Sequence, residues 1–131
     1  MAVSIVGTWK LVGATAKGAD GAALPEPYGG QGIGRVTFTA DGRMQSVVCD
    51  GRKELPAGVA RDYASYCGNY TFDGTKLVTR VDAASDPARL GSDQVRGVRF
   101  EGELVVLTPP PRQSGGVQEY RELTWQKISD D

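Results

Sequence analysis

Three tight turns, each an acidic residue followed by glycine, divide much of this chain into short alternating segments. They are Asp41-Gly42, Asp73-Gly74 and Glu101-Gly102. Such a pair between two runs of alternating apolar and polar residues is a strong short-range signal of a β-hairpin. Because no helical segment separates the runs on either side of these turns, they favour a meander of antiparallel strands over a parallel sheet.

The remaining elements are predicted from the alternation between the turns. Residues 17–32 are rich in glycine, alanine and proline, carry no strand or helix period and are expected to form a long loop. Residues 55–66 are the one helical candidate, because Val59, Tyr63 and Tyr66 follow one another at helical spacing. The predicted strands span residues 5–14, 34–40, 43–49, 68–72, 76–82, 94–100, 104–108 and 117–128.

The order of these elements predicts an all-β fold. We expect a single up-and-down antiparallel barrel of about eight strands with one short helix. The chain has 131 residues, and single cores usually form at roughly 100–150 residues. Residues 1–131 are therefore expected to be one barrel domain.

Composition excludes several classes of function. The chain has no histidine, which removes Ser-His-Asp and Cys-His catalysis and histidine metal sites. A net charge of -1 without a basic block argues against a nucleic-acid or anionic-membrane partner. Cys49 and Cys67 fit no metal spacing and are expected to be small buried side chains in a reducing compartment. With no visible secretory signal or long apolar run, we expect a cytoplasmic protein that needs no metal and no cofactor.

The segment 94–100 carries the first indication of function. Val98 and Phe100 mark its apolar face, and the period of two places Gln94 and Arg96 on that same inward face. An inward arginine is costly unless it is paired, and no Asp or Glu falls on the inward faces of the other strands. Arg96 is therefore either satisfied by backbone carbonyls or a core acid, or it presents a planar array of donors to a ligand carboxylate, phenolate or enolate.

The same alternation gives the wall of a candidate ligand site, although each wall residue also has a purely structural interpretation. The tyrosines near the predicted helix, for example, could simply pack it across a barrel end. Trp125 is expected in the core with Arg121 laid across an indole, and Tyr28 is a candidate lid over the mouth. Leu104, Val106 and Thr108 share one face of their strand. Besides Arg96 and Gln94, the candidate ligand-binding residues are Phe38, Met44, Ser46, Val48, Tyr63, Tyr66, Tyr70, Phe72, Thr79 and Val98.

Five segments of the chain carry a family resemblance: 6–12 with Gly7-Thr8-Trp9, 34–44, 66–70, Gln94-Val95-Arg96 and Leu123-Thr124-Trp125. In this order they resemble the bacterial and fungal lipocalin-like domain family of small, non-secreted barrels, over about residues 5–128. The resemblance implies a calycin-type barrel, plugged by the tryptophan of 6–12, whose mouth opens on a cavity for a small apolar molecule. Some barrels of broadly similar type act as cyclases or isomerases, and members of the family often carry a histidine near residues 79–80. This chain has none, so activities that need it do not carry over.

These observations leave three functions open. The first is a barrel that binds a small hydrophobic or aromatic molecule through an anionic or acceptor group held by Arg96. The second is a cofactor-independent cyclase or isomerase, in which Arg96 stabilises an enolate or phenolate and Tyr63, Tyr66 or Tyr70 transfers a proton. The third is a barrel with a filled interior that acts through its surface, for instance as a homodimer. An eight-stranded barrel has the size at which side chains either fill the interior or leave room for one small ligand.

Overall fold

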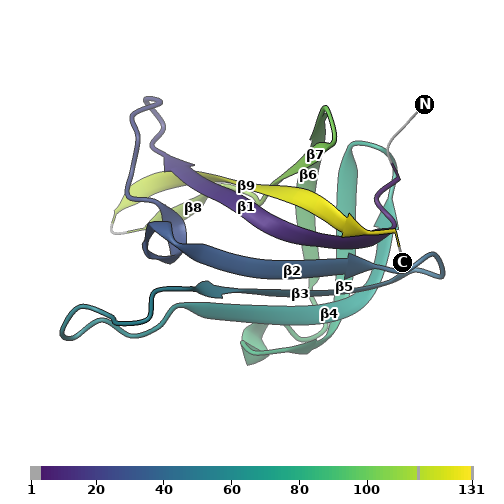
Figure 1. Cartoon of the computed structure of the whole chain (residues 1–131), viewed down its shortest axis with the longest axis horizontal. Helices are drawn as coiled ribbons and strands as arrows, with labels where there is room; N and C mark the ends of the chain where they lie inside the picture. Colours follow the sequence, from purple (N-terminus) through teal and green to yellow (C-terminus); the bar gives the residue numbers. More distant parts are fainter. Residues whose placement is uncertain (1–3, 115, 131) are drawn as a thin grey trace.

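The computed structural model describes residues 4–114 and 116–130, and their strands form one antiparallel barrel (Figure 1). Eight strands pair in the order β1-β2-β3-β4-β5-β6-β7-β9, and β9 returns to β1 to close the barrel. A short ninth strand, β8, pairs with the beginning of β9. The predicted all-β up-and-down barrel of eight strands is confirmed. The strands are β1 (Gly7–Lys17), β2 (Gly32–Phe38), β3 (Arg43–Asp50), β4 (Tyr63–Phe72), β5 (Lys76–Ala84), β6 (Asp93–Glu101), β7 (Leu104–Thr108), β8 (Arg112–Ser114) and β9 (Val117–Ser129).

The predicted helix over residues 55–66 is wrong. Residues 51–62 form a loop, and β4 begins at Tyr63, which pairs with Cys49 of β3. From there β4 hydrogen-bonds to β3 on one side and β5 on the other, and this pairing overrides a weak helical pattern. In the described residues the helical segments are two single turns of 3-10 helix, η1 (Pro27–Gly30) and η2 (Pro87–Arg89).

The two ends of the barrel differ in the length of their connections. The three acidic-glycine turns lie at the end where β1 begins and β9 finishes. The longer connections 18–31, 51–62 and 85–92, and the segment 109–114 that contains β8, lie at the opposite end. Figure 1 shows the chain termini on the right, with the loops before β2 and before β4 on the left. The long-loop end is the mouth of the barrel.

The short-turn end is closed by packed aromatic side chains. Trp9 is completely buried, its indole N–H donates to the carbonyl of Ile5 at 2.9 Å, and the Lys127 ammonium lies 5.1 Å from its ring centroid. The rings of Phe38 and Tyr70 meet edge to face at 5.1 Å, and the Tyr70 hydroxyl leaves the core to donate to a backbone carbonyl of Thr39. This end of the barrel is filled, as the tryptophan plug implied by the resemblance requires.

The interior face of β7 is the one carrying Val105 and Leu107, which belong to the core cluster. The alternate face, with Leu104, Val106 and Thr108, points away from that cluster. Val106 is nonetheless buried, in register with Arg99 on β6 and Thr124 on β9. Arg99 pairs with Glu101 and Glu122, so the neighbour of this outward valine on β6 belongs to a surface ion-pair group.

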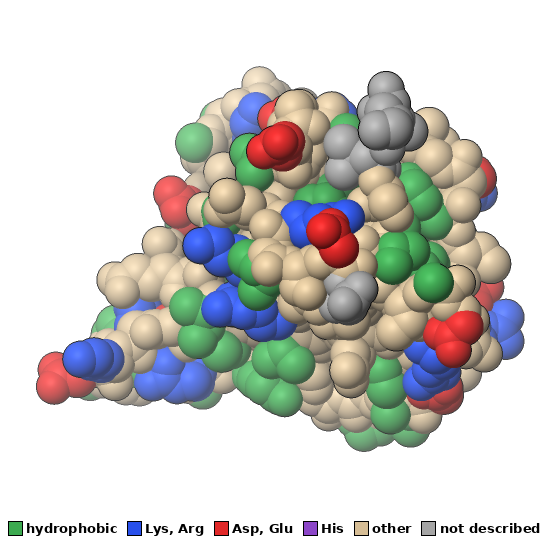
Figure 2. Space-filling view, turned by 45° about the vertical axis from the view of Figure 1, so that its right-hand side comes forward, with side chains coloured by type: hydrophobic (Ala, Val, Ile, Leu, Met, Phe, Trp, Pro, Cys, Tyr) green, Lys and Arg blue, Asp and Glu red, His purple; other side chains and the backbone are tan. Residues whose placement is uncertain are grey.

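Charges of both signs are interspersed on the outside of the barrel. Figure 2 shows basic and acidic side chains distributed among polar and apolar ones over the face that it presents. Several are paired across strands, including Arg43 with Asp82 and Arg80 with Asp93. No helix in the described part of the chain is long and apolar enough to span a membrane.

Candidate ligand-binding cavity

A cavity of about 250 Å³ lies inside the barrel, between the closed end and the mouth. Strands β2 to β9 and both 3-10 turns contribute to its wall. An apolar cavity of about 150 Å³ is enough to bind benzene. The space therefore suits a substituted ring or a compact two-ring compound. Its apolar lining is made by Val36, Met44, Val48, Leu77, Leu107, Leu123 and Trp125, among others.

Half of the candidate ligand residues line this cavity. Each projects inward from β3, β4 or β6, as the alternation of a strand requires. They bring polar groups into the wall, because a hydroxyl, a phenol, an amide and a guanidinium are among them. These residues are Met44, Ser46, Val48, Tyr66, Gln94 and Arg96.

The other six candidates lie elsewhere. Phe38, Tyr70, Phe72 and Val98 pack at or against the core of the barrel, where Phe72 meets Phe100 edge to face at 6.3 Å. Tyr63 lies on the outer surface with 55% of its area exposed. Thr79 is buried on β5 but is not among the residues that line the cavity.

Arg96 lies in the cavity wall without an acidic partner. Its Nη1 donates to the carbonyl of Val95 at 2.9 Å and its Nη2 to Oε1 of Gln94 at 3.3 Å. Neither acceptor carries a charge, and no ion pair joins Arg96 to a carboxylate within the described residues. Because a guanidinium has five N–H groups, these two bonds leave donors for a ligand.

Gln94 is itself held in place by a chain of hydrogen bonds. Its Nε2 donates to the hydroxyl of Ser92 at 3.0 Å, and that hydroxyl donates to the backbone carbonyl of Arg89 at 2.6 Å. The amide is thereby oriented with its oxygen toward Arg96. The loop before β6 thus fixes the direction of the guanidinium in the cavity wall.

Three more arginines line the cavity near its mouth. Arg112 and Arg121 share Oε1 of the buried Glu119 at 2.9 and 2.8 Å, and Arg89 lies 5.4 Å from the ring centroid of Tyr66. Four arginines therefore line the described part of the cavity, with a single neighbouring carboxylate among their ion-pair partners. In a water-poor cleft such an excess of one sign attracts ligands of the opposite sign.

Tyr28 covers part of the mouth from η1. Its ring lies 5.9 Å from the guanidinium of Arg121, which corrects the expectation that Arg121 is laid across an indole. Burial raises the pKa of the Tyr28 phenol, and the nearby Arg121 charge opposes that shift. The backbone of Tyr28 is left-handed, with φ 59°, a conformation that costs about 1–2 kcal/mol for a residue with a side chain.

The loop after β3 supports the segment that carries Tyr28. Arg52 forms an ion pair with the buried carboxylate of Asp50 at 2.6 Å and packs so closely on Gly29 that a side chain there would overlap it. The Arg52 guanidinium, with a backbone N–H, lowers the pKa of Asp50. An ion pair at the end of β3 thus supports the segment that places Tyr28 in the cavity wall.

A family model for the lipocalin-like domain matches residues 6–58 and, as a second segment, residues 47–128. Together the two segments cover nearly the whole chain. This chain belongs to the lipocalin-like domain family. Searches of curated proteins and of solved structures find no significant match.

Sequence reasoning missed two of the four arginines that line the cavity in the described part of this lipocalin-like barrel. Arg89 lies in η2 and Arg112 in the three-residue β8, and neither segment shows an alternation that would orient a side chain. The only available signal was their position in loops that a meander places at the mouth. The inward position of Arg121 did follow from the last strand.

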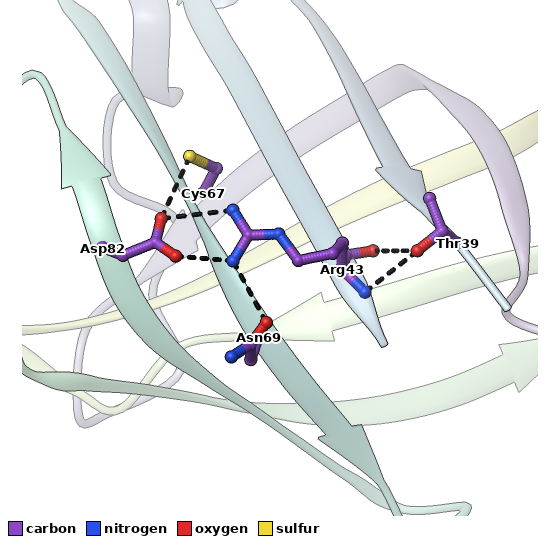
Figure 3. Close-up of polar contacts among 5 residues, drawn as sticks. All are labelled: Thr39, Arg43, Cys67, Asn69 and Asp82. Atoms are coloured by element: carbon purple, nitrogen blue, oxygen red, sulfur yellow. Dashed lines mark hydrogen bonds and ion pairs between the residues drawn. The ribbon is translucent and has the colours of Figure 1, made fainter. Parts of the chain in front are cut away.

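A second polar cluster lies on the outside of the lipocalin-like barrel (Figure 3). Arg43 of β3 forms an ion pair with Asp82 of β5 at 2.5 Å and donates to Asn69 of β4 at 3.1 Å, while the Cys67 thiol lies 3.5 Å from Asp82. Hydrogen bonding to Arg43 lowers the pKa of Asp82. The cluster ties three strands together across an exposed surface. No group of three potential metal ligands occurs in the described ranges 4–114 and 116–130.

Proposed function

We propose that the barrel binds a small hydrophobic or aromatic molecule whose anionic or acceptor group is anchored by Arg96 and Gln94. The observation that carries this proposal is the guanidinium of Arg96 in the cavity wall with only neutral partners. A charge that is partly withdrawn from water is costly without a counter-charge. A ligand carboxylate supplies that counter-charge and accepts the remaining N–H groups.

The rest of the cavity supports the same class of ligand. Its apolar wall contributes about 25 cal/mol for each Å² of apolar ligand surface that it removes from water. The arginines at the mouth attract an anion toward the opening, and the phenol rings of Tyr28 and Tyr66 offer flat surfaces beside it. The apolar wall thus supplies affinity, and Arg96 supplies orientation.

The test compares 2-naphthoate with its neutral methyl ester, which have the same ring system. Arg96→Met removes the charge and keeps an apolar side chain, so isothermal titration should show a loss of about tenfold or more for the acid. The ester should change by less than about threefold because it offers no charge to the anchor. Arg35→Met is the matched control, since Arg35 lies exposed on the outer face of β2. An equal loss for acid and ester would make Arg96 a structural residue.

A second candidate function is the cofactor-independent cyclase or isomerase. It is favoured by one observation: Tyr66 and Arg96 line the same cavity, whereas Tyr63 and Tyr70 do not. In this mechanism Arg96 stabilises a developing enolate or phenolate and the Tyr66 phenol transfers the proton. Native mass spectrometry of the protein from its own cells supplies the compound to test. Tyr66→Phe should then abolish product formation in an enzyme and leave binding within about threefold in a carrier.

The cytoplasmic location and the homodimer also stay predictions. The location is supported by Cys49 and Cys67, which form no disulfide. A homodimer is supported by exposed apolar side chains on the outer faces of β2, β3 and β4, namely Ile33, Val47 and Tyr63. Light scattering on the purified protein distinguishes one copy from two.

A further inference from the structure

The guanidinium of Arg89 lies in the cavity wall with all of its hydrogen-bond donors unused. Arg89 is half-buried in η2, and its charge lies 5.4 Å from the ring centroid of Tyr66. Over the ranges 4–114 and 116–130 its five N–H groups make neither a hydrogen bond nor an ion pair. The two acids nearest to it in sequence are engaged elsewhere, since Asp86 caps η2 and Asp93 pairs with Arg80. The donors of Arg89 are therefore available to a ligand.

Arg89 and Arg96 differ from the other two arginines of the cavity in having no acidic partner. Arg112 and Arg121 share Glu119, which neutralises one of their two charges. Arg96 donates to two neutral acceptors, and Arg89 contacts a neutral ring. Two positive charges in one partly enclosed space repel each other, and each of them attracts an anion. The cavity wall thus offers two sites for negative groups rather than one.

The two sites lie at different depths on the same side of the cavity. Arg89 belongs to the connection 85–92 at the mouth, whereas Arg96 lies three residues into β6, about 10 Å along the strand. The carbonyl of Arg89 accepts from Ser92, and Ser92 accepts from Gln94. Gln94 in turn accepts from Arg96. This chain of hydrogen bonds fixes the backbone of Arg89 relative to the deeper guanidinium.

We propose that the ligand is an aromatic dianion, with one anionic group held by Arg96 and a second, at the other end of its apolar body, held by Arg89. This inference rests on the proposed binding function. A carboxylate accepts two parallel N–H bonds from a guanidinium, and Arg89 has that pair of donors free. Its contact with the ring of Tyr66 holds the guanidinium at the cavity wall. Arg89 therefore selects diacids over monoacids of the same shape.

Matched pairs of compounds test this selection. The probes are naphthalene-2,6-dicarboxylate and naphthalene-2,7-dicarboxylate, each with its monomethyl ester, so that the members of a pair have the same rings and differ in one charge. The half ester can still place its carboxylate on Arg96. In isothermal titration, at least one diacid should bind the wild-type protein about fivefold or more tightly than its half ester.

Arg89→Met assigns the preference to this side chain. Methionine keeps an apolar side chain beside Tyr66 and leaves the backbone carbonyl that accepts from Ser92 unchanged. The preference for the diacid should fall to within about twofold, while the affinity for 2-naphthoate changes by less than about threefold. Arg35→Met removes the same charge from the outer face of β2 and should keep the preference. Circular dichroism checks each fold, and Arg89→Gln replaces Arg89→Met if the methionine variant is unfolded.

The outcomes separate this inference from the proposed function. Equal binding of each diacid and its half ester to the wild-type protein overturns the role of Arg89, and the Arg96 anchor stands if Arg96→Met still weakens 2-naphthoate. A preference for the diacid that persists in Arg89→Met also overturns this inference, because another group then holds the second charge. Failure of every compound to bind the wild-type protein overturns both proposals.

Discussion

In the cavity wall, the charged guanidinium of Arg96 is hydrogen-bonded to the neutral amide of Gln94: Nη2 of Arg96 donates to Oε1 of Gln94 at 3.3 Å. The amide orients the guanidinium without cancelling its charge. A carboxylate in the same place would orient the guanidinium and would also neutralise its charge. Glutamine at position 94 is therefore the choice that leaves Arg96 available to an anion from outside. This relationship can be tested by changing a single functional group.

Gln94→Glu should weaken the binding of acids selectively. The introduced carboxylate pairs with Arg96, so the affinity for 2-naphthoate should fall about tenfold, because a like charge now faces the ligand and the anchor is occupied. The affinity for methyl 2-naphthoate should change by less than about threefold. Titration calorimetry with both compounds measures the two effects. A comparable loss for the ester would show that the substitution acts through the shape of the cavity.

Tyr28→Asn should distinguish the contribution of the Tyr28 ring to ligand retention from the cost of its left-handed backbone. Asparagine adopts the left-handed conformation at φ 59° more readily than tyrosine, so the midpoint of urea unfolding should be unchanged or slightly higher. The ring over Arg121 is lost, so ligand should dissociate faster. Stopped-flow displacement of a bound aromatic acid measures that rate. An unchanged rate would show that Tyr28 does not cover the ligand.

Glu119→Gln should destabilise the fold more than removal of the exposed partner charge on Arg112. Glu119 is buried and bonded to two arginines, and Arg121, with 14% of its side chain exposed, would lose its counter-charge. The loss in free energy of unfolding should be about 2 kcal/mol or more. Arg112→Gln is the control, since Arg112 reaches the same oxygen from an exposed position and should cost less than about 1 kcal/mol. Similar costs would mean that solvent reaches Glu119.

The alternation of side chains predicted the part of the fold and site that lies on regular strands. It placed Arg96, Gln94 and Ser46 in the interior because a strand that is half buried must show a period of two. It could not orient β7, whose sequence Leu-Val-Val-Leu is apolar on both faces. The helical spacing of Val59, Tyr63 and Tyr66 was misleading because β4 is held by its pairing with β3 and β5, and that pairing is not encoded in the local spacing of apolar residues.

The mouth was the least predictable part of the molecule. Arg89 and Arg112 reach the cavity from a turn and from a three-residue strand, where no periodicity fixes the direction of a side chain. The sequence also does not show that the buried N–H of Trp125 has no hydrogen-bond partner in the described part of the chain, because hydrogen bonding depends on which atoms surround the ring. Trp9 and Trp125 look alike as apolar residues on a strand, and only their surroundings distinguish them.

Asp50→Asn should remove part of the acid sensitivity of the protein. The pKa of Asp50 is lowered in the folded state by its bonds to Arg52, relative to about 3.9 in an unfolded chain. A lowered folded pKa gives stability that is present above the unfolded value and is lost as the pH falls through the folded one. Wild type should therefore exceed Asp50→Asn in urea-unfolding midpoint at pH 7, and the difference should shrink below about pH 4. A difference as large at pH 3 as at pH 7 would contradict the ion pair as its source.

Gly68→Ala should disrupt the barrel by steric overlap alone. Gly68 lies at the bulge where β4 shifts its register against β5, and a Cβ there would overlap the carbonyl oxygen of Arg80. Because the obstacle is backbone, two paired strands must separate, and the expected loss is about 3 kcal/mol in free energy of unfolding. Gly13→Ala is the control, since nothing lies within 4 Å of a Cβ at that position of β1 and its loss should be below about 0.5 kcal/mol. Urea unfolding measures both, and equal stability of the two variants would show that β4 and β5 can part at the bulge without cost.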